Sequence, residues 1–243
     1  MNRDPAAEVA LVTGAGTGIG RALAIALAGT GRSVVVVGRR PELLEETALA
    51  IRQLGGSADV RPTDVSDPAA VDGLVGFIGS KLGRLDVLVH STGAHAFGHL
   101  EQAPVDQLDT LYASNLLGPF LLTRATLPLL KKAEGEIVFM NSSVVFGARA
   151  GVAGYSAMKH GLRAMADSLR AEVNPAGIRV LTVYLGRVAT PTQEEISRRE
   201  ERPYVAAQIL QPEDVATIVL ASLGLPRTAE VTDLHIRHFV STS

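Results

Sequence analysis

Short apolar runs alternate with longer amphipathic segments along this chain. Runs such as Ser33–Val37 and Leu85–His90 are apolar almost throughout, which is typical of strands buried on both faces of a parallel sheet. The segments between the runs carry apolar residues at helical spacing. This alternation predicts successive βαβ units.

The predicted strands are Val9–Thr13, Ser33–Val37, Ala58–Arg61, Leu85–His90, Glu136–Asn141, Arg179–Tyr184 and Thr232–Ile236. The predicted helices are Gly20–Thr30, Pro41–Leu54, Pro68–Leu82, Val105–Lys132, Gly154–Asn174 and Pro212–Leu223. No linker or internal repeat divides the chain, so we expect one domain over residues 1–243. Its predicted class is α/β, a single Rossmann-type doubly wound parallel sheet of about seven strands flanked by helices.

The charged segment Gln193–Arg202 interrupts this rhythm. Its Glu194/Arg198 and Glu195/Arg199 pairs suit a solvated helix. The spacing alone favours a charged surface turn, while the position after a strand end leaves open a lid over a site.

Composition and charge narrow the classes of function. A net charge of −2 gives no electrostatic reason to expect nucleic acid or an anionic membrane surface as a partner. The absence of cysteine excludes disulfides and thiolate metal ligands, and no metal site is predicted. The N-terminus lacks the apolar core of a signal peptide, and no apolar stretch approaches the ~18–20 residues of a membrane span. We therefore expect a cytoplasmic protein.

Tyr155, Lys159 and Ser142 form a candidate acid/base set. Tyr155 and Lys159 are four residues apart, so they share one face of a helix, where an ammonium favours the phenolate and lowers the pKa of a tyrosine. Ser142 follows a predicted buried strand, at the edge of a parallel sheet where ligands bind. Taken alone, Tyr155 and Lys159 are better explained as an ordinary amphipathic pair, and the rest of the chain reverses that preference.

A glycine-rich turn joins the first predicted strand to the first predicted helix. It contains Gly14, Thr17, Gly18, Ile19 and Gly20. Glycine lets backbone N–H groups approach a pyrophosphate at a helix N-terminus. The spacing does not fit G-x-G-x-x-G, and a plain tight turn is the alternative. The flanking strand and helix favour a dinucleotide cradle.

The end of the second strand bears on the choice of dinucleotide. Gly38-Arg39-Arg40 offers arginine where an NAD site usually places an acid for the ribose. Arg39 therefore favours NADP(H), with NAD(H) as the alternative. Asp64 and Val65 follow the third strand and could contact the adenine, although Asp64 also suits a turn or helix cap.

Together these residues resemble the short-chain dehydrogenase/reductase family, in its single-domain branch. The family pattern T-G-x-x-x-G-x-G matches Thr13 to Gly20, and Y-x-x-x-K matches Tyr155 and Lys159. The family serine lies thirteen residues before the tyrosine, at Ser142, and the family asparagine matches Asn115. The resemblance covers nearly the whole chain.

The resemblance implies an oxidoreductase that interconverts a carbonyl and an alcohol with a nicotinamide cofactor. Tyr155 is then the proton donor, Ser142 holds the carbonyl oxygen, Lys159 lowers the tyrosine pKa and binds the nicotinamide ribose, and Asn115 holds a water. Cofactor contacts are also implied for Gly93, Gly186, Val188 and Thr190.

Two motifs depart from the family pattern. The family's N-N-A-G appears as His90-Ser91-Thr92-Gly93, and its P-G appears as Leu185-Gly186. A histidine satisfied within the core is the favoured interpretation of His90. Leucine in place of proline should loosen the second turn slightly.

Substrate and partners are less constrained by the sequence. The loops at His95-Ala96-Phe97 and Val144-Val145-Phe146, with Tyr184 and the segment Pro191–Leu210, are expected to frame a pocket for a small, largely apolar ketone, aldehyde or alcohol. His95 is expected to be a solvent-exposed loop residue. The resemblance implies a homodimer or homotetramer. A dinucleotide-binding sensor or partner-binding module without turnover is the alternative function.

Overall fold

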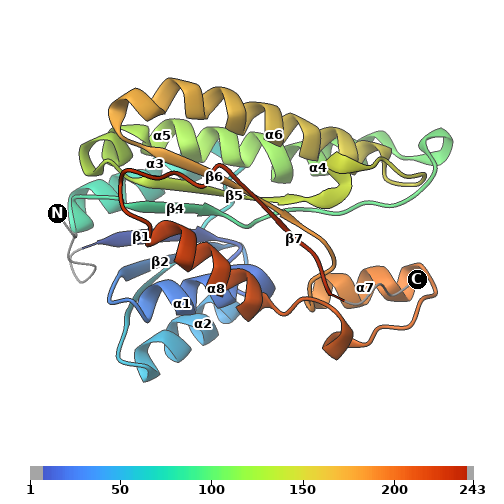
Figure 1. Cartoon of the computed structure of the whole chain (residues 1–243), viewed down its shortest axis with the longest axis horizontal. Helices are drawn as coiled ribbons and strands as arrows, with labels where there is room; N and C mark the ends of the chain where they lie inside the picture. The colour runs from blue at the N-terminus through green and yellow to red at the C-terminus, as the bar shows by residue number, and fades with distance from the viewer. Residues whose placement is uncertain (1–7, 240–243) are drawn as a thin grey trace.

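The computed structural model describes residues 8–239, which form a seven-stranded sheet covered by helices (Figure 1). All neighbouring strands are parallel, in the order β3-β2-β1-β4-β5-β6-β7. The strands are β1 Val9–Thr13, β2 Ser33–Gly38, β3 Ser57–Pro62, β4 Val87–His90, β5 Glu136–Ser142, β6 Arg179–Leu185 and β7 Asp233–Ile236. The predicted α/β fold is confirmed.

The strand order reverses direction between β1 and β4. The chain runs outward from β1 through β2 to β3, then crosses back to place β4 on the other side of β1. Loops leaving β1 and β4 therefore separate to opposite faces, which opens a crevice at the carboxyl ends of these strands.

Helices cover both faces of the sheet (Figure 1). On one face lie α3, α4, α5 and α6, and on the other lie α1, α2 and α8. Their bounds are α1 Gly18–Ala28, α2 Pro41–Gln53, α3 Pro68–Phe77, α4 Val105–Tyr112, α5 Gly118–Ala133, α6 Ala153–Val173 and α8 Pro212–Leu223. Short π-helical turns, η2 Ile78–Leu82 and η4 Ala113–Leu117, follow α3 and α4.

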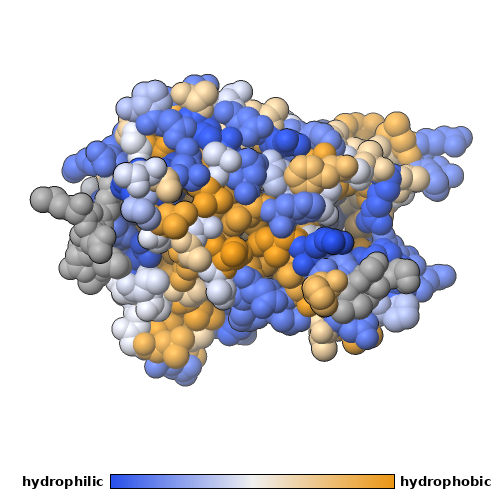
Figure 2. Space-filling view, viewed as in Figure 1, coloured by the Kyte–Doolittle hydropathy of each residue, from blue (hydrophilic) through white to orange (hydrophobic). Residues whose placement is uncertain are grey.

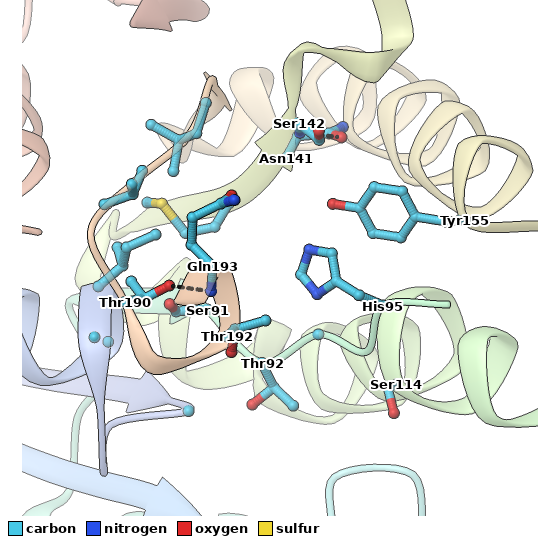
Figure 3. A pocket seen from close by; sticks show the side chains of 18 of the residues that line it. Ser91, Thr92, His95, Ser114, Asn141, Ser142, Tyr155, Thr190, Thr192 and Gln193 are labelled. Atoms are coloured by element: carbon cyan, nitrogen blue, oxygen red, sulfur yellow. Dashed lines mark hydrogen bonds between the residues drawn. The ribbon is translucent and has the colours of Figure 1, made fainter. Parts of the chain in front are cut away.

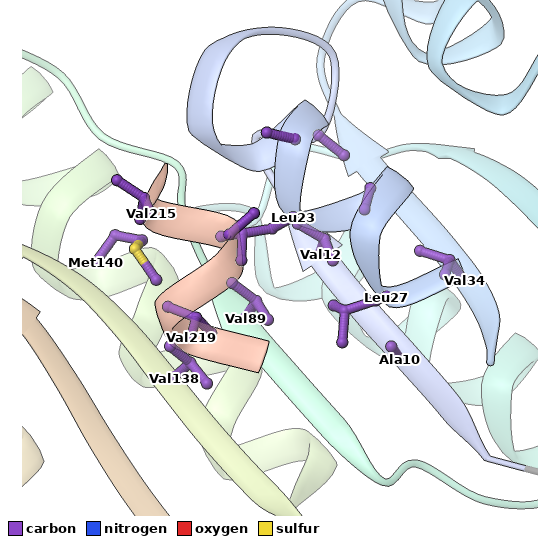
Figure 4. Packing of buried hydrophobic residues seen from close by; sticks show 14 of the residues in the cluster. Ala10, Val12, Leu23, Leu27, Val34, Val89, Val138, Met140, Val215 and Val219 are labelled. Atoms are coloured by element: carbon purple, nitrogen blue, oxygen red, sulfur yellow. The ribbon is translucent and has the colours of Figure 1, made fainter. Parts of the chain in front are cut away.

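The continuous apolar character of the strands follows from this double covering. In β1, Ala10 and Val12 belong to the core beneath α1 and α8, whereas Val9 and Leu11 belong to the core on the opposite face. Figure 4 shows Leu23 and Leu27 of α1 with Val215 and Val219 of α8 over the sheet. Leu23 is fully buried, so Leu23→Ala should cost about 2–5 kcal/mol of stability.

Two predicted helices contain π-helical turns that the sequence did not indicate. The predicted helix Val105–Lys132 is interrupted by the π-helical turn η4, and Pro68–Leu82 ends in the π-helical turn η2. Both turns keep the helical direction, so the hydrophobic pattern continues through them and does not reveal them.

Pro191–Arg199 forms helix α7, as the charged pairs of Gln193–Arg202 indicate, so the favoured alternative of a surface turn was wrong. Thr190 accepts a hydrogen bond from the Gln193 backbone N–H at 3.1 Å, and Pro191 occupies the first helical turn. Threonine followed three residues later by glutamine is a helix-start signal. Arg199 pairs with Glu195 as expected, at 2.8 Å, and Arg198 pairs with Glu195 rather than with Glu194.

Among residues 8–239 we find no helix whose length and apolar character would carry it across a lipid bilayer.

Candidate active site

A cleft of about 1260 Å³ lies at the carboxyl ends of the strands. Residues after β1, β2, β4, β5 and β6 line it, together with the first turn of α1 and part of α7. Its volume exceeds the roughly 300–1,000 Å³ of a typical drug-sized pocket. The cleft is therefore large enough for a dinucleotide and a small substrate together.

The predicted glycine turn forms one end of this cleft. Gly14 and Gly18 have φ angles of 66° and 53°, which favour glycine. A Cβ atom at Gly20 would lie 2.3 Å from the Gly14 carbonyl oxygen, so no larger residue fits there without a backbone shift. Thr17 precedes α1 and makes no side-chain cap bond to it. The first N–H groups of α1 thus remain available to an anion in the cleft.

Gly14 and Gly18 also bring separate parts of the cleft together. A Cβ at Gly14 would approach the Ser91 carbonyl oxygen to 2.9 Å, and one at Gly18 would approach Thr190 Cγ2 to 2.9 Å. The turn therefore packs directly against the loops after β4 and β6. Thr17, Ile19 and Thr190, three of the residues expected to contact a cofactor, all line the cleft.

Arg39 is exposed on the wall of the cleft, directly after β2. Asp64 lies close by and adopts the turn that was its alternative reading, since its carboxylate accepts bonds from Ser66 N at 3.0 Å and Ser66 Oγ at 2.7 Å. These bonds, and then the Arg39 guanidinium, lower the pKa of Asp64. Asp64 and Val65 both line the cleft beside Arg39.

Ser142, Tyr155 and Lys159 come together at the other end of the cleft. Ser142 is the last residue of β5, and Tyr155 and Lys159 lie in the first turns of α6. Figure 3 shows Ser142 near the phenol of Tyr155 across the cavity. The Ser142 hydroxyl lowers the pKa of the phenol, against the opposing effect of burial. The predicted acid/base set is thus assembled in space.

Asn141 joins the two elements that carry this set, and the sequence reasoning missed it. Its Nδ2 donates to the Lys159 carbonyl at 3.1 Å, and its Oδ1 accepts from the Ser142 N–H at 2.8 Å. The end of β5 is thereby tied to α6. A lone amide inside an apolar strand, directly before Ser142, was the available signal.

The buried positions of Tyr155 and Lys159 shift both of their pKa values. Burial raises the pKa of Tyr155 to about 12, against opposing effects of the Ser142 hydrogen bond and the Arg149 guanidinium. Burial lowers the pKa of Lys159 to about 8. Lys159 Nζ donates to the Met140 carbonyl at 3.1 Å and lies 5.8 Å from the Tyr155 ring centroid. In this arrangement Lys159 does not produce the lowered tyrosine pKa that was expected.

Asn115 lies in the π-helical turn η4 and is fully buried. Its Nδ2 donates to the carbonyls of Ala94 and Leu111, both at 3.0 Å. Its Oδ1 has no hydrogen-bond partner among the described residues. A Cβ at Gly93 would lie 2.9 Å from Asn115 Oδ1 and 3.8 Å from Lys159 Nζ. The unpaired amide oxygen and the ammonium therefore both lie close to Gly93.

His95 lies directly against the predicted proton donor, which the sequence did not indicate. Its ring stacks on Tyr155 with centroids 4.6 Å apart (Figure 3). The side chain is open to the cleft, as expected of a loop residue. The surrounding walls nevertheless desolvate the ring, and with Lys159 nearby they lower the pKa of His95 to about 4.

The expected apolar frame of the substrate pocket is only partly present. Phe97, Val144 and Ile196 line the cleft, but Val145 and Tyr184 are buried in the protein. Phe146 packs against Tyr184 and His235, both with ring centroids 4.8 Å away. Charged side chains take part of the wall instead, namely Arg149, Arg187, Glu200 and Arg237.

The two departures from the family pattern are accommodated. His90 Nε2 lies 2.9 Å from Thr123 Oγ1, and its ring stacks on Phe139. The prediction of a satisfied core histidine is confirmed. Thr13 Oγ1 accepts bonds from the N–H groups of Ser91 and Thr92 at 3.0 and 3.2 Å, which fix the following loop.

The loop after β6 is also held despite Leu185. Gly186 N–H donates to the Ile236 carbonyl at 2.9 Å, and Val188 pairs with Leu210. Gly186, Val188 and Thr190 all line the cleft. Within the described part of the chain, no three His, Asp or Glu residues are grouped as a metal site would require.

Comparison with known proteins gives the same relationship along most of the chain. The model of the short chain dehydrogenase family matches residues 8–201. An uncharacterized oxidoreductase of Staphylococcus epidermidis is 32% identical, over 95% of this chain and 96% of the relative. One from Staphylococcus aureus strain USA300 is 30% identical over the same shares.

Solved structures with the same fold include three cofactor complexes. A metagenomic short-chain oxidoreductase with NADP has a TM-score of 0.85 and 29% identity, covering 98% of this chain and 100% of that chain. An alcohol dehydrogenase from Thermococcus sibiricus with 5-hydroxy-NADP has a TM-score of 0.87 and 27% identity, covering 97% and 98%. A variant of actinorhodin polyketide ketoreductase with NADPH has a TM-score of 0.87 and 29% identity, covering 97% of each chain.

The fold, the cleft and these matches define the class of this protein as an oxidoreductase. The chain belongs to the short-chain dehydrogenase family.

Proposed function

We propose that this protein is an NADP(H)-dependent oxidoreductase that interconverts a carbonyl and a primary or secondary alcohol. The observation that carries the proposal is the meeting of Ser142, Tyr155 and Lys159 in one cleft with a bare glycine cradle. The named cofactors of the solved relatives, NADP, 5-hydroxy-NADP and NADPH, support the choice of nucleotide.

The residues present fit such a cofactor. Gly14, Thr17, Gly18, Ile19 and Gly20 would hold its pyrophosphate against the N-terminus of α1. Arg39 would hold the 2′-phosphate, with Asp64 and Val65 near the adenine. Gly93, Lys159, Gly186, Val188 and Thr190 would surround the nicotinamide ribose and carboxamide. When bound, NADPH supplies a hydride to the carbonyl carbon.

Tyr155 is the proposed general acid. Its phenol donates a proton to the carbonyl oxygen while Ser142 donates a hydrogen bond to the same atom. The oxygen thereby becomes the hydroxyl of the product alcohol. In the reverse direction Tyr155 removes that proton.

Lys159 and Asn115 are proposed to restore the proton of Tyr155. The pKa of Lys159 is lowered to about 8 by burial, so its ammonium releases and regains a proton near neutral pH more readily than an exposed lysine. The unpaired Asn115 Oδ1 lies, like Lys159 Nζ, close to Gly93 and would hold a water that carries the proton from solvent.

Replacing Tyr155 by phenylalanine tests this assignment. The variant keeps the ring and its stacking on His95 but lacks the acidic proton, so we expect turnover to fall by at least about 100-fold. NADPH affinity, measured by fluorescence titration, should change little. Activity equal to the wild-type protein would refute the role of Tyr155.

The NADPH titration, combined with an assay of carbonyl reduction, tests the alternative function, a dinucleotide-binding sensor without turnover. Tight NADPH binding with no carbonyl reduced, in a broad panel of ketones and aldehydes, would favour the sensor. Homo-oligomerisation and a cytoplasmic location remain predictions from the sequence.

A further inference from the structure

A cluster of charged residues borders the cleft beyond Tyr155. Arg149 lies in the loop between β5 and α6, and Glu200 lies at the end of α7. Arg149 Nη1 and Glu200 Oε1 are 3.2 Å apart, so an ion pair joins the two segments. Glu200 also pairs with Arg202. One carboxylate is therefore shared by two guanidinium groups.

Positive charge exceeds negative charge at this end of the cleft. Among the described residues that line it, Asp64 and Glu200 are the only acids, and Asp64 lies at the opposite end beside Arg39. Arg149, Arg187 and Arg237 also line the cleft, and Arg149 and Arg187 lie near Glu200. Burial, and then the nearby Arg202 and Arg149, lower the pKa of Arg187 against the opposing effect of Glu200.

Arg149 also acts on the proposed reaction centre. Arg149 and Tyr155 line the same cleft, and the Arg149 guanidinium opposes the rise that burial causes in the pKa of Tyr155. Half of the Arg149 side chain is exposed, with a relative accessibility of 53%, whereas that of Glu200 is 20%. Arg149 thus has an accessible side chain on the wall of the cleft that Tyr155 also lines.

We propose that Arg149 binds a carboxylate of the substrate, so that the preferred substrates are oxo acids and the corresponding hydroxy acids. This inference rests on the proposed carbonyl/alcohol reaction and replaces the expectation of an apolar substrate. The planar guanidinium can form two parallel hydrogen bonds to a carboxylate. In the free protein Arg149 forms an ion pair with Glu200. When substrate binds, its carboxylate replaces Glu200 as the partner of Arg149, and Glu200 keeps its ion pair with Arg202.

The replacement of Glu200 by the substrate carboxylate explains why the proposed site for an anion contains an acidic residue. Glu200 keeps the guanidinium of Arg149 paired when the cleft is empty of substrate. Because it competes with the substrate for Arg149, its removal should strengthen acid binding. Removal of Arg149 should weaken it, so the two partners of one ion pair are predicted to have opposite effects.

The test compares each acid with its neutral methyl ester. Levulinate and benzoylformate, each against its methyl ester, are titrated calorimetrically into the protein with and without NADP. We expect the wild-type protein to bind the acid of at least one pair more tightly. In Arg149→Gln the ratio of acid to ester affinity should fall by about 10- to 100-fold, as for a lost hydrogen-bonded charge.

Two further variants give the test its controls. Glu200→Gln breaks the same ion pair as Arg149→Gln, so general loosening of α7 would change the ratio in the same direction in both. A rise of the ratio in Glu200→Gln supports competition instead. Arg198→Gln removes an exposed positive charge from α7 whose described partner is Glu195, and should leave the ratio unchanged.

Equal binding of acid and ester, binding of neither, or a ratio unaffected by Arg149→Gln would overturn the proposal. The outcome is separate from that of the proposed reaction, because binding needs no turnover. A preserved acid preference without reduction of any carbonyl by NADPH would count against the reaction alone.

Discussion

His90 is an ionisable side chain enclosed in the core. It is 3% exposed, contacts Thr123 through a hydrogen bond and stacks on Phe139. Burial lowers its pKa to about 3 from the ordinary value of 6.5. The folded protein therefore keeps His90 neutral in mild acid, where the unfolded chain takes up a proton.

This difference predicts a loss of stability in acid. Because the folded pKa is below the unfolded one, the contribution of His90 is present above pH 6.5 and is lost as the pH falls toward about 3. At about pH 5 the loss amounts to about 2 kcal/mol relative to neutral pH. Urea unfolding of the wild type and His90→Asn at both pH values measures it. All other groups titrate alike in the wild type and in His90→Asn. If the free energy of unfolding changed equally with pH in the two proteins, the prediction would be wrong.

Arg39 is the residue on which the choice of nucleotide depends. It is exposed directly after β2, at the position where an NAD site usually places an acid for the ribose hydroxyls. Arg39→Ala should weaken NADPH binding by about 10- to 100-fold, as expected for a lost contact to a charged phosphate, and NADH binding far less. Parallel fluorescence titrations provide the measurement. Equal losses for the two nucleotides would remove the phosphate role.

Sequence reasoning found the residues with strong local constraints. Ser142, Tyr155 and Lys159 line one cleft, because their spacing along a strand and a helix fixes where they point, whereas Asn115 is fully buried. His95 and Arg149 belong to loops, whose conformation depends on distant contacts such as the Arg149–Glu200 ion pair. No spacing rule connects residues so far apart.

At the scale of elements, the glycines differ in what they permit. Gly20 has a backbone oxygen 2.3 Å from where a Cβ would stand, whereas Gly73, inside α3, has no atom within 4 Å. The sequence alone does not show which of these glycines is enclosed by other atoms, because that depends on how the elements pack. The π-helical turn η4 that holds Asn115 is another case, because apolar spacing continues through it.

A pair of alanine substitutions separates these two situations. Gly20→Ala should destabilise the protein by about 1–3 kcal/mol or more and abolish tight NADPH binding, because the turn before α1 must shift. Gly73→Ala should instead raise stability by about 0.5–1 kcal/mol, since alanine favours an exposed helix. Thermal unfolding and NADPH titration of both variants measure these effects. A stable Gly20→Ala protein with normal affinity would show that the turn tolerates a side chain.

At the scale of the whole molecule, two surfaces formed by the described residues expose large apolar side chains to solvent. On α4, Val105, Leu108 and Tyr112 follow helical spacing, and Leu108 and Tyr112 are each 45% exposed. Figure 2 shows hydrophobic residues gathered at the centre of another face, where β7 and α8 come to the front in Figure 1. Ile218 of α8 is 40% exposed, and β7 is the last strand of the sheet. An open strand edge and apolar side chains favour self-association.

The family resemblance implies a homodimer or a homotetramer, and substitutions on the two apolar surfaces can distinguish between them. A dimer needs one self-complementary surface, whereas a tetramer with two-fold axes needs two. If both surfaces are used, Tyr112→Glu and Ile218→Glu should each convert a tetramer to a dimer, and the double variant should be a monomer. Light scattering coupled to gel filtration measures the mass.

Leu49→Glu, at an apolar residue of α2 that is 54% exposed, is the matched control and should leave the mass unchanged. A wild-type monomer at micromolar concentration would refute the expectation, and a dimer sensitive to only one substitution would identify the surface in use.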